Sequence, residues 1–274
     1  MMTPLLTLET CRELTDARIR GVAQLEVSLD LSRSRTTVAI EASRWSHQGF
    51  SYPYPANCKA RAIYHWQDGE FQVVSRYQGA LVKLVPTPWG PPTFEIDGIK
   101  MLPSEAASPY LDAKRKVQLI RPGGKIVLDC CAGLGYFAAW CLAEGAARVL
   151  SFEKNSEVLW LRSKNPWSPA HDHRLELSQA DISQAVEGIP TGSVDAVLHD
   201  PPRFSIAGEL YAEAFYRQLA RVLRPKGLLF HYTGAPQAVS RRRDLAGEVS
   251  IRLEACGFRI ERALDGVLGR RNGD

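Results

Sequence analysis

The sequence lacks the features that mark a membrane or exported protein. No apolar run among its 274 residues approaches the roughly 20 residues that a bilayer span needs. The first six residues contain no basic segment, no extended apolar core and no small-residue cleavage site. We therefore expect a cytoplasmic protein that does not bind a membrane.

Cysteine is too scattered for a metal centre. None of the six cysteines forms a C-x-x-C pair, and no cysteine and histidine residues share zinc-ligand spacing. The adjacent Cys130 and Cys131 would form a very strained disulfide. We therefore expect no metal, and we expect all the cysteines to be buried, reduced thiols.

No long region concentrates positive charge. The formal net charge is +4, and residues 1–100 contain 11 Lys and Arg against 10 Asp and Glu. A chain that neutralises many phosphates would gather its basic residues. The run Arg241-Arg242-Arg243 is more typical of a solvated face than of a substrate clamp. Charge alone therefore gives nucleic-acid binding only weak support.

The amino-terminal part of the chain, residues 1–103, reads as short strands after one helix at residues 8–20. Gln67-Asp68-Gly69 is typical of a hairpin turn. The strands are expected at residues 22–31, 36–42, 62–66, 70–74 and 93–99. We assign residues 1–103 to a small β-rich accessory domain.

Residues 104–274 alternate helix and strand. The expected strands are residues 125–129, 148–152, 175–178, 196–198, 227–231 and 258–268. The expected helices are residues 110–120, 136–144, 156–163, 209–223 and 247–256. This alternation predicts an α/β domain with a doubly wound, mostly parallel sheet.

The most informative stretch is residues 127–135, VLDCCAGLG. An apolar strand ends in Asp129, and a tight turn containing Gly133 and Gly135 leads into a helix. Ligands of open α/β sheets bind beyond the carboxyl ends of strands, and the glycines would let the backbone approach one closely. An ordinary strand-to-helix turn is the plain alternative. A nicotinamide site would need a third glycine, and an aspartate would repel its pyrophosphate. The acid instead favours the cationic amino-acid end of S-adenosyl-L-methionine.

This stretch resembles the first motif, D-x-G-x-G-x-G, of class I S-adenosyl-L-methionine-dependent methyltransferases, with Cys131 in place of the first glycine. The resemblance implies a seven-stranded sheet, and it implies that Glu153 holds the ribose hydroxyls and Asp181 the adenine amino group. Glu153 could instead be a solvated acid, and Asp181 could cap a helix. The candidate cofactor-binding residues are Asp129, Cys131, Ala132, Gly133, Leu134, Gly135, Glu153, Lys154, Asp181, Ile182 and Asp200.

Residues 199–204, HDPPRF, form the candidate catalytic loop. Pro201 and Pro202 fix an extended turn and leave the Asp200 carboxylate and nearby carbonyls as acceptors for an amino group. The loop resembles the D-P-P-aromatic motif of amino-directed methyltransferases, although Arg203 occupies the aromatic position. Arginine can stack on a base or bind a phosphate or carboxylate. The candidate catalytic residues are Asp200, Pro201, Pro202 and Arg203, and a turn without chemistry is the alternative.

Several aromatic and histidine side chains near this loop are more typical of the core than of a pocket. His199 ends a buried strand, where a hydrogen-bonded structural role is the more common one. Tyr211, Phe215 and Tyr216 are spaced to share one helix face, and we expect them to pack in the core.

Longer fragments resemble a predicted methyltransferase family that is best represented in archaea. They are residues 92–101, 128–136, 165–168, 199–204, 208–211 and 230–234. The resemblance implies that residues 165–167 and 199–204 line the substrate pocket. A histidine that usually follows the methionine of the first fragment is replaced here by Leu102.

The expected function is methylation of a nitrogen, with RNA (tRNA or rRNA) as the partner. One alternative is a transferase that uses S-adenosyl-L-methionine, or its decarboxylated form, on a small-molecule amine. Another is a nucleic-acid-binding protein without catalysis. The sequence leaves the acceptor and the oligomeric state open.

Overall fold

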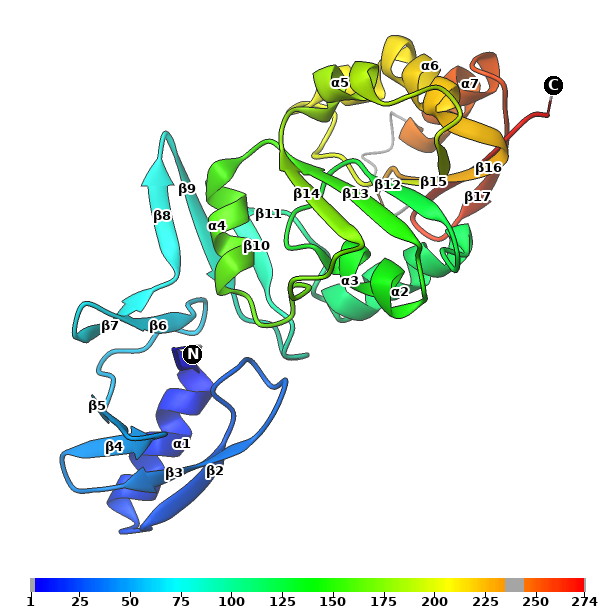
Figure 1. The fold of residues 1–274 in the computed structure, drawn as a ribbon. Helices are drawn as coiled ribbons and strands as arrows, with labels where there is room; N and C mark the ends of the chain where they lie inside the picture. The colour runs from blue at the N-terminus through cyan, green and yellow to red at the C-terminus, as the bar shows by residue number, and fades with distance from the viewer. Residues whose placement is uncertain (1–2, 235–243, 274) are drawn as a thin grey trace. The chain divides into compact units, whose positions relative to one another are not determined.

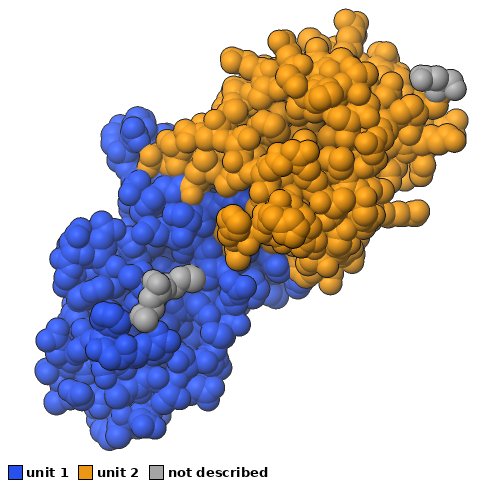
Figure 2. Space-filling view, viewed as in Figure 1, with its two compact units in different colours: residues 1–111, 160–167 blue, residues 112–159, 168–274 orange. Residues whose placement is uncertain are grey.

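The chain folds into two compact units, shown in the computed structural model of Figures 1 and 2. Unit 1 contains residues 1–111 and 160–167, and unit 2 contains residues 112–159 and 168–274. The structure describes residues 3–234 and 244–273, so the Arg241-Arg242-Arg243 run lies outside the described residues. Within those ranges, no helix is both long enough and apolar enough to cross a bilayer.

Unit 1 is built from short antiparallel strands in three sheets and one amino-terminal helix (Figure 1). The sheets have the strand orders β1-β6-β7, β2-β3-β4-β5 and β11-β10-β9-β8. The elements are β1 (Leu5–Leu6), α1 (Leu8–Ile19), β2 (Gln24–Val27), β3 (Thr36–Ile40), β4 (Arg44–His47), β5 (Phe50–Pro53), β6 (Tyr64–Gln67), β7 (Glu70–Val73), β8 (Ser75–Gln78), β9 (Ala80–Val85), β10 (Thr93–Ile96) and β11 (Ile99–Lys100).

The turns of unit 1 follow from residues that accept a positive φ. The predicted hairpin at Asp68 and Gly69 is confirmed, with φ of 52° and 83° at the two turn residues between β6 and β7. The single strand predicted at residues 93–99 is wrong. The chain reverses at Asp97 and Gly98, with φ of 49° and 77°, so that β10 pairs with β11.

The core of unit 1 combines one face of α1 with a cluster of aromatic rings. Leu14 and Ala17 are buried on the helix. The rings of Trp45 and Tyr52 stack with centroids 4.6 Å apart, and the Trp45 indole N–H donates to the Pro53 carbonyl at 3.2 Å. Such stacked pairs add about 0.5–1.5 kcal/mol beyond the area they bury.

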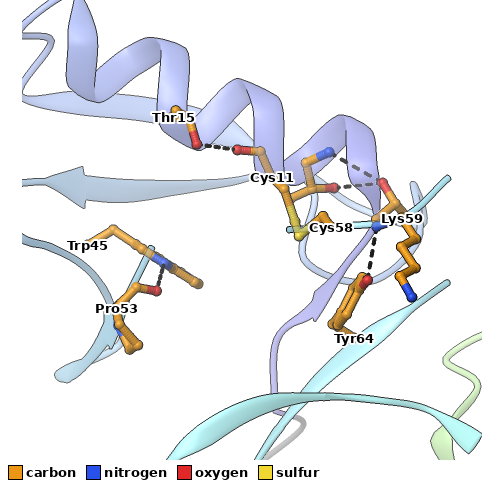
Figure 3. Close-up of a disulfide and its surroundings, with 9 residues drawn as sticks. Cys11, Thr15, Trp45, Pro53, Cys58, Lys59 and Tyr64 are labelled. Carbon is orange, nitrogen blue, oxygen red and sulfur yellow. Dashed lines mark hydrogen bonds between the residues drawn. A yellow bond between two sulfur atoms is a disulfide. The ribbon is translucent and has the colours of Figure 1, made fainter. Parts of the chain in front are cut away.

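Cys11 and Cys58 form a disulfide, contrary to the expectation that every cysteine is a reduced thiol (Figure 3). The bond joins α1 to the loop before β6 across 47 residues of sequence. The Lys59 N–H donates to the Tyr64 hydroxyl at 2.9 Å beside it. The other four cysteines are free: Cys130, Cys131, Cys141 and Cys256.

Residues 160–167 lie between two segments of unit 2 in sequence but pack within unit 1. The guanidinium group of Arg76 lies 4.0 Å from the centroid of the Trp160 ring. The Trp167 indole N–H donates to the Leu31 carbonyl at 2.9 Å. Leu161 is fully buried. The helix α4 (Ser156–Lys164) therefore belongs partly to each unit.

Unit 2 contains a mixed seven-stranded sheet with the order β14-β13-β12-β15-β16-β18-β17. The strands are parallel apart from β18, which pairs antiparallel with both of its neighbours. The elements are α2 (Pro109–Ile120), β12 (Ile126–Asp129), α3 (Tyr136–Ala143), β13 (Arg148–Glu153), β14 (Leu175–Gln179), α5 (Ile182–Ala185), η1 (Val186–Gly188), β15 (Val194–His199), η2 (Gly208–Tyr211), α6 (Glu213–Val222), β16 (Leu223–Tyr232), α7 (Leu245–Ala255), β17 (Phe258–Ala263) and β18 (Gly266–Arg271).

Helices cover both faces of this sheet, with α2 and α3 on one face and α5, α6 and α7 on the other (Figure 1). Tyr211, Phe215 and Tyr216 are buried in the core of the second face, as predicted. Two predicted elements are each divided in the structure. The expected helix at residues 209–223 is interrupted at Ala212, and the expected strand at residues 258–268 reverses near Leu264 into the β17–β18 pair.

Candidate active site

Four carboxylates gather at the carboxyl ends of neighbouring strands in unit 2. Asp129 ends β12, Glu153 ends β13, Asp181 follows β14 and Asp200 follows β15. The sequence order of the strands reverses between β12 and β15, which is where open α/β sheets bind their ligands. The sheet thus brings together residues that are up to 71 positions apart in sequence.

The glycine turn after β12 is held by the acid that ends β13. Gly133 and Gly135 have φ of 50° and 82°, a region that glycine enters without strain. One oxygen of Glu153 accepts from the Gly133 N–H at 3.0 Å, and the other accepts from the Asn155 N–H at 2.9 Å. Glu153 therefore holds the turn in place, in addition to lying at the carboxyl end of β13.

Asp129 is completely buried, and the Ser151 hydroxyl donates to its Oδ2 at 2.7 Å. Ser151 lies opposite Asp129 in the β12–β13 register. This hydrogen bond gives one carboxylate oxygen a donor and so reduces the free-energy cost of burying Asp129.

Asp181 caps the short helix α5, the alternative role considered from the sequence. Its Oδ1 accepts from the Ser183 N–H at 2.9 Å and from the Ser183 hydroxyl at 2.7 Å. The Lys154 ammonium lies 3.6 Å from its other oxygen. Partial burial raises the pKa of Asp181, but the Ser183 hydrogen bonds and Lys154 outweigh it, so the net pKa is lowered. The carboxylate is therefore ionised at neutral pH.

A cavity of about 60 Å³ opens between these strand ends. Its lining residues are Cys130, Cys131, Phe152, Glu153, Lys154, Ala180, Asp181, Ile182, Pro202 and Leu210. Six predicted site residues are among them. The others do not line this cavity: Asp129, Ala132, Gly133, Leu134, Gly135, Asp200, Pro201 and Arg203. The walls offer apolar faces for a flat ring and carboxylates for hydroxyl groups, a set that suits a nucleoside.

The loop after β15 presents a half-buried carboxylate. Burial raises the pKa of Asp200 to about 6, against the opposing charge of Lys116. The Tyr211 hydroxyl donates to the Pro202 carbonyl at 3.0 Å and ties the loop to the core. The Arg203 side chain is exposed.

A buried lysine near Asp200 was missed from the sequence. The Lys116 ammonium lies 2.7 Å from Asp112, 3.2 Å from Asp265 and 4.3 Å from the centroid of the Tyr232 ring. The spacing of Asp112 and Lys116 by four residues was visible, but such pairs usually lie on exposed helix faces. Only the tertiary fold shows that this pair is buried.

His199 belongs to a buried hydrogen-bonded network, as expected from the sequence. Its Nε2–H donates to the Leu210 carbonyl at 3.0 Å, and its ring meets that of His231 edge to face at 4.4 Å. The Tyr216 hydroxyl donates to His231 Nε2 at 2.8 Å. Burial lowers the pKa of His199 to about 4, so the ring is neutral at physiological pH. In the part of the chain that the structure describes, no three His, Cys, Asp or Glu side chains are grouped to hold a metal.

The remaining candidates for the substrate pocket, residues 165–167, lie in unit 1. Asn165 accepts from the Trp167 N–H at 3.1 Å, and the Trp167 indole binds the Leu31 carbonyl. These contacts give the segment a structural role within unit 1. Its part in binding a substrate stays a prediction.

Comparisons with known proteins agree with this geometry. Residues 157–273 match a family described as S-adenosyl-L-methionine-dependent methyltransferase. An uncharacterized protein of Methanocaldococcus jannaschii is 40% identical over 208 residues, which cover 74% of this chain and 71% of that protein. The 23S rRNA (uracil(1939)-C(5))-methyltransferase of Acidithiobacillus ferrooxidans is 31% identical over 93 residues, covering 33% of this chain and 21% of that enzyme.

A solved spermidine synthase, in complex with the transition state analogue AdoDATO, shares the fold. The TM-score is 0.59 with 16% identity, and the match covers 73% of each chain. The strand order, the glycine turn and the matched family agree on one class of enzyme and on its cofactor. The chain belongs to the S-adenosyl-L-methionine-dependent methyltransferases, in one family with the Methanocaldococcus jannaschii protein.

Proposed function

We propose that the enzyme transfers the methyl group to a nitrogen atom of an RNA. The observation that carries the proposal is the placement of Asp200, a half-buried carboxylate that follows β15 and precedes by two residues Pro202 of the cavity lining. Its pKa of about 6 lies close to physiological pH, so it can accept a proton there. The rigid Pro201 and Pro202 turn limits how far the carboxylate can move.

The cofactor fits the residues around the cavity. Glu153 would accept hydrogen bonds from the ribose hydroxyls, and Asp181 from the adenine amino group, while Ile182 packs against the ring. The buried Asp129 favours the positive charge at the other end of the molecule. Bound S-adenosyl-L-methionine supplies an electrophilic methyl group.

The loop at residues 200–203 would position the acceptor. The Asp200 carboxylate and the neighbouring carbonyls accept hydrogen bonds from an amino group and orient its lone pair. Asp200 can then take the proton that the nitrogen loses. The exposed Arg203 would bind a phosphate or stack on a base.

RNA is supported by the local similarity to an rRNA methyltransferase, which covers a third of this chain. That enzyme is named for a carbon atom of uracil, so the similarity supports the class of substrate and not the atom. We further propose that residues 1–103, the predicted accessory domain, help to hold the RNA.

A small-molecule amine is the second candidate, and the surroundings of Asp200 favour it. Asp112 and Asp265 both contact the buried Lys116 ammonium, and all three influence the pKa of Asp200. A cationic amine would find carboxylates there. The spermidine synthase fold agrees with this candidate.

Incubation with radiolabelled S-adenosyl-L-methionine decides between the two. Total RNA, protein and small-molecule fractions are tested separately. We expect label in RNA, and digestion to nucleosides should then show a base methylated on nitrogen. Label confined to the small-molecule fraction would overturn the RNA proposal and support the amine.

The Arg203→Ala variant tests the contact with the acceptor. We expect KM for RNA to rise about tenfold with kcat little changed. The reason is that Arg203 would stabilise the bound RNA and the transition state by the same amount. The matched control is Arg217→Ala, an exposed arginine on α6 that pairs with Glu213. Equal KM values for both variants would remove Arg203 from the acceptor site.

A further inference from the structure

A second cavity, of about 280 Å³, lies in unit 2 where the parallel strands begin, at the opposite end of the strands from the cofactor site. Lys125 directly precedes β12, and Asp195 lies at the start of β15. Because β18 runs antiparallel to β16, Arg270 near the carboxyl end of β18 lies at this same end of the sheet. From Val194 to His199 β15 rises roughly 16 Å at ~3.3 Å per residue, which separates this cavity from Asp200.

The lining of the cavity is strongly cationic. It consists of Arg121, Lys125, Asp195, Arg224, Pro225, Lys226, Gly227, Leu228 and Arg270. The single carboxylate, Asp195, already accepts from the Ile126 N–H at 2.8 Å and from the Arg224 guanidinium at 2.5 Å. Its charge therefore offsets that of Arg224. Four further cations face the cavity without a compensating acid in its lining.

These cations are close enough to repel one another. Burial lowers the pKa of Lys125, Asp195 opposes the shift, and the charges of Arg121 and Arg270 lower the pKa further. Within residues 3–234 and 244–273, neither Arg121 nor Arg270 forms an ion pair. An anion in the cavity would relieve this repulsion.

Two of the cationic side chains are carried at backbone positions that favour glycine. Arg121 has φ of 51° and Lys226 has φ of 63°. The chain is tightly folded beside Lys226, where a Cβ on Gly227 would lie 2.6 Å from Leu223 Cγ. Strained positions of this kind are frequent at ligand-binding sites.

We propose that this cavity binds a phosphate group. Guanidinium groups present paired N–H donors that match phosphate oxygens, and lysine adds a point charge. The volume of about 280 Å³ leaves room for a phosphate or diphosphate. The phosphate belongs either to a free phosphorylated metabolite or to an RNA backbone. The site is independent of which acceptor the enzyme methylates.

Calorimetric titration with inorganic pyrophosphate tests the site on the full chain. We expect one binding event per chain, which weakens as the salt concentration rises. The Arg121→Gln/Arg270→Gln double variant should lose at least about tenfold in affinity, or roughly 1.4 kcal/mol. Arg217→Gln, which removes one exposed arginine elsewhere in unit 2, should bind pyrophosphate like the wild type. No binding by the wild type, or equal affinity in the double variant, overturns the proposal.

Two further measurements keep the result clear. Unchanged affinity of the double variant for S-adenosyl-L-methionine shows that unit 2 is folded. If the double variant does not fold, the single variants Arg270→Gln and Arg270→Lys replace it, of which only the second keeps the positive charge. Equal pyrophosphate affinities for these two variants overturn the proposal. An RNA oligonucleotide that displaces pyrophosphate from the wild type, and binds the variant more weakly, identifies the RNA backbone as the source. Pyrophosphate binding without that competition identifies a free phosphorylated ligand. The labelling assay for methyl transfer is scored separately, so failure of one proposal does not imply failure of the other.

Discussion

The Lys116 ammonium lies 2.7 Å from the Asp112 carboxylate, one helical turn earlier on α2, and the lysine side chain is only 1% exposed. Burial alone would lower the pKa of Lys116, but the negative charges of Asp200, Asp112 and Asp265 outweigh it and raise the net pKa. Lys116 therefore stays charged at physiological pH. Its charge also limits the pKa of Asp200, which burial would otherwise raise further.

Replacing Lys116 by methionine should destabilise the protein by about 3–5 kcal/mol at pH 8, because Asp112 and Asp265 lose their buried cation. The loss should be smaller at pH 5, because burial raises the pKa of Asp265 and this acid is then more easily protonated. Urea unfolding at both pH values measures the difference. The control is Lys114→Met on the same helix, which removes an ammonium 4.5 Å from the centroid of the Trp140 ring. It should cost less than about 1 kcal/mol. Equal costs for the two variants would contradict the role given to Lys116.

Asp200→Asn should lower kcat at least about tenfold and leave the affinity for S-adenosyl-L-methionine nearly unchanged. The carboxylate acts on the acceptor nitrogen, and its loss is felt mainly in the transition state. Wild-type kcat should rise as the pH increases through about 6, because the ionised form of Asp200 accepts the proton. Steady-state kinetics from pH 5 to 9 measures both effects. A variant that keeps wild-type kcat, or the same pH profile, would remove Asp200 from the reaction.

The same substitution should stabilise the folded protein at high pH. The pKa of Asp200 is raised on folding from 3.8 to about 6, so the unfolded chain releases this proton first. The wild type therefore loses stability as the pH rises from about 4 to about 6. At pH 8 Asp200→Asn should be about 1–2 kcal/mol more stable than the wild type, and at pH 4 the two should be equal. Thermal unfolding at both pH values checks this. A variant that is less stable than the wild type at pH 8 would show that the folded protein does not disfavour the ionised form of Asp200.

Glu153→Gln should weaken binding of S-adenosyl-L-methionine by about 1–3 kcal/mol, because the ribose hydroxyls lose a charged acceptor. The apo protein should lose about 1 kcal/mol of stability as well, since the Gly133 and Asn155 N–H groups also donate to this carboxylate. Calorimetry and urea unfolding separate the two effects. The control is Glu176→Gln, an acid on β14 that pairs with Arg148 at the surface. Lost stability with unchanged affinity would make Glu153 purely structural.

Cys58→Ser should destabilise unit 1 by about 2–4 kcal/mol, because the Cys11–Cys58 bond closes a long loop of the unfolded chain. A reducing agent should bring the wild type to the level of the variant. Cys256→Ser, at a free cysteine, should show no such response. Mass spectrometry after alkylation reports the bond directly, and labelling of both Cys11 and Cys58 in the untreated protein would refute it.

The sequence was most informative where the local pattern and the tertiary structure agree. The strand that ends at Asp129 and the helix that begins at Tyr136 are found as predicted, because apolar residues and glycines determine them locally. The hairpin at Asp97 and Gly98 was missed although its turn residues are typical. The reversal at Leu264 was also missed, although Asp265 and Gly266 follow it directly; the positive φ of 51° lies at Leu264, and Gly266 is the first residue of β18.

Long-range contacts could not be predicted from one sequence. Nothing in the pattern indicates that Cys11 meets Cys58, or that Lys116 meets Asp265, because each pair is brought together only by the folded chain. The roles of the cofactor and acceptor residues, and the domain boundary after residue 103, stay predictions.

The return of residues 160–167 to unit 1 has a consequence for dissection of the protein. Neither unit is one continuous stretch of chain, so no single cut yields either of them whole. A fragment that starts at residue 112 would carry Trp160, Leu161 and Trp167 without their partners and expose them to water. Exchange of the amino-terminal part alone would leave the same mismatch, so a chimaera that replaces unit 1 has to exchange residues 160–167 as well.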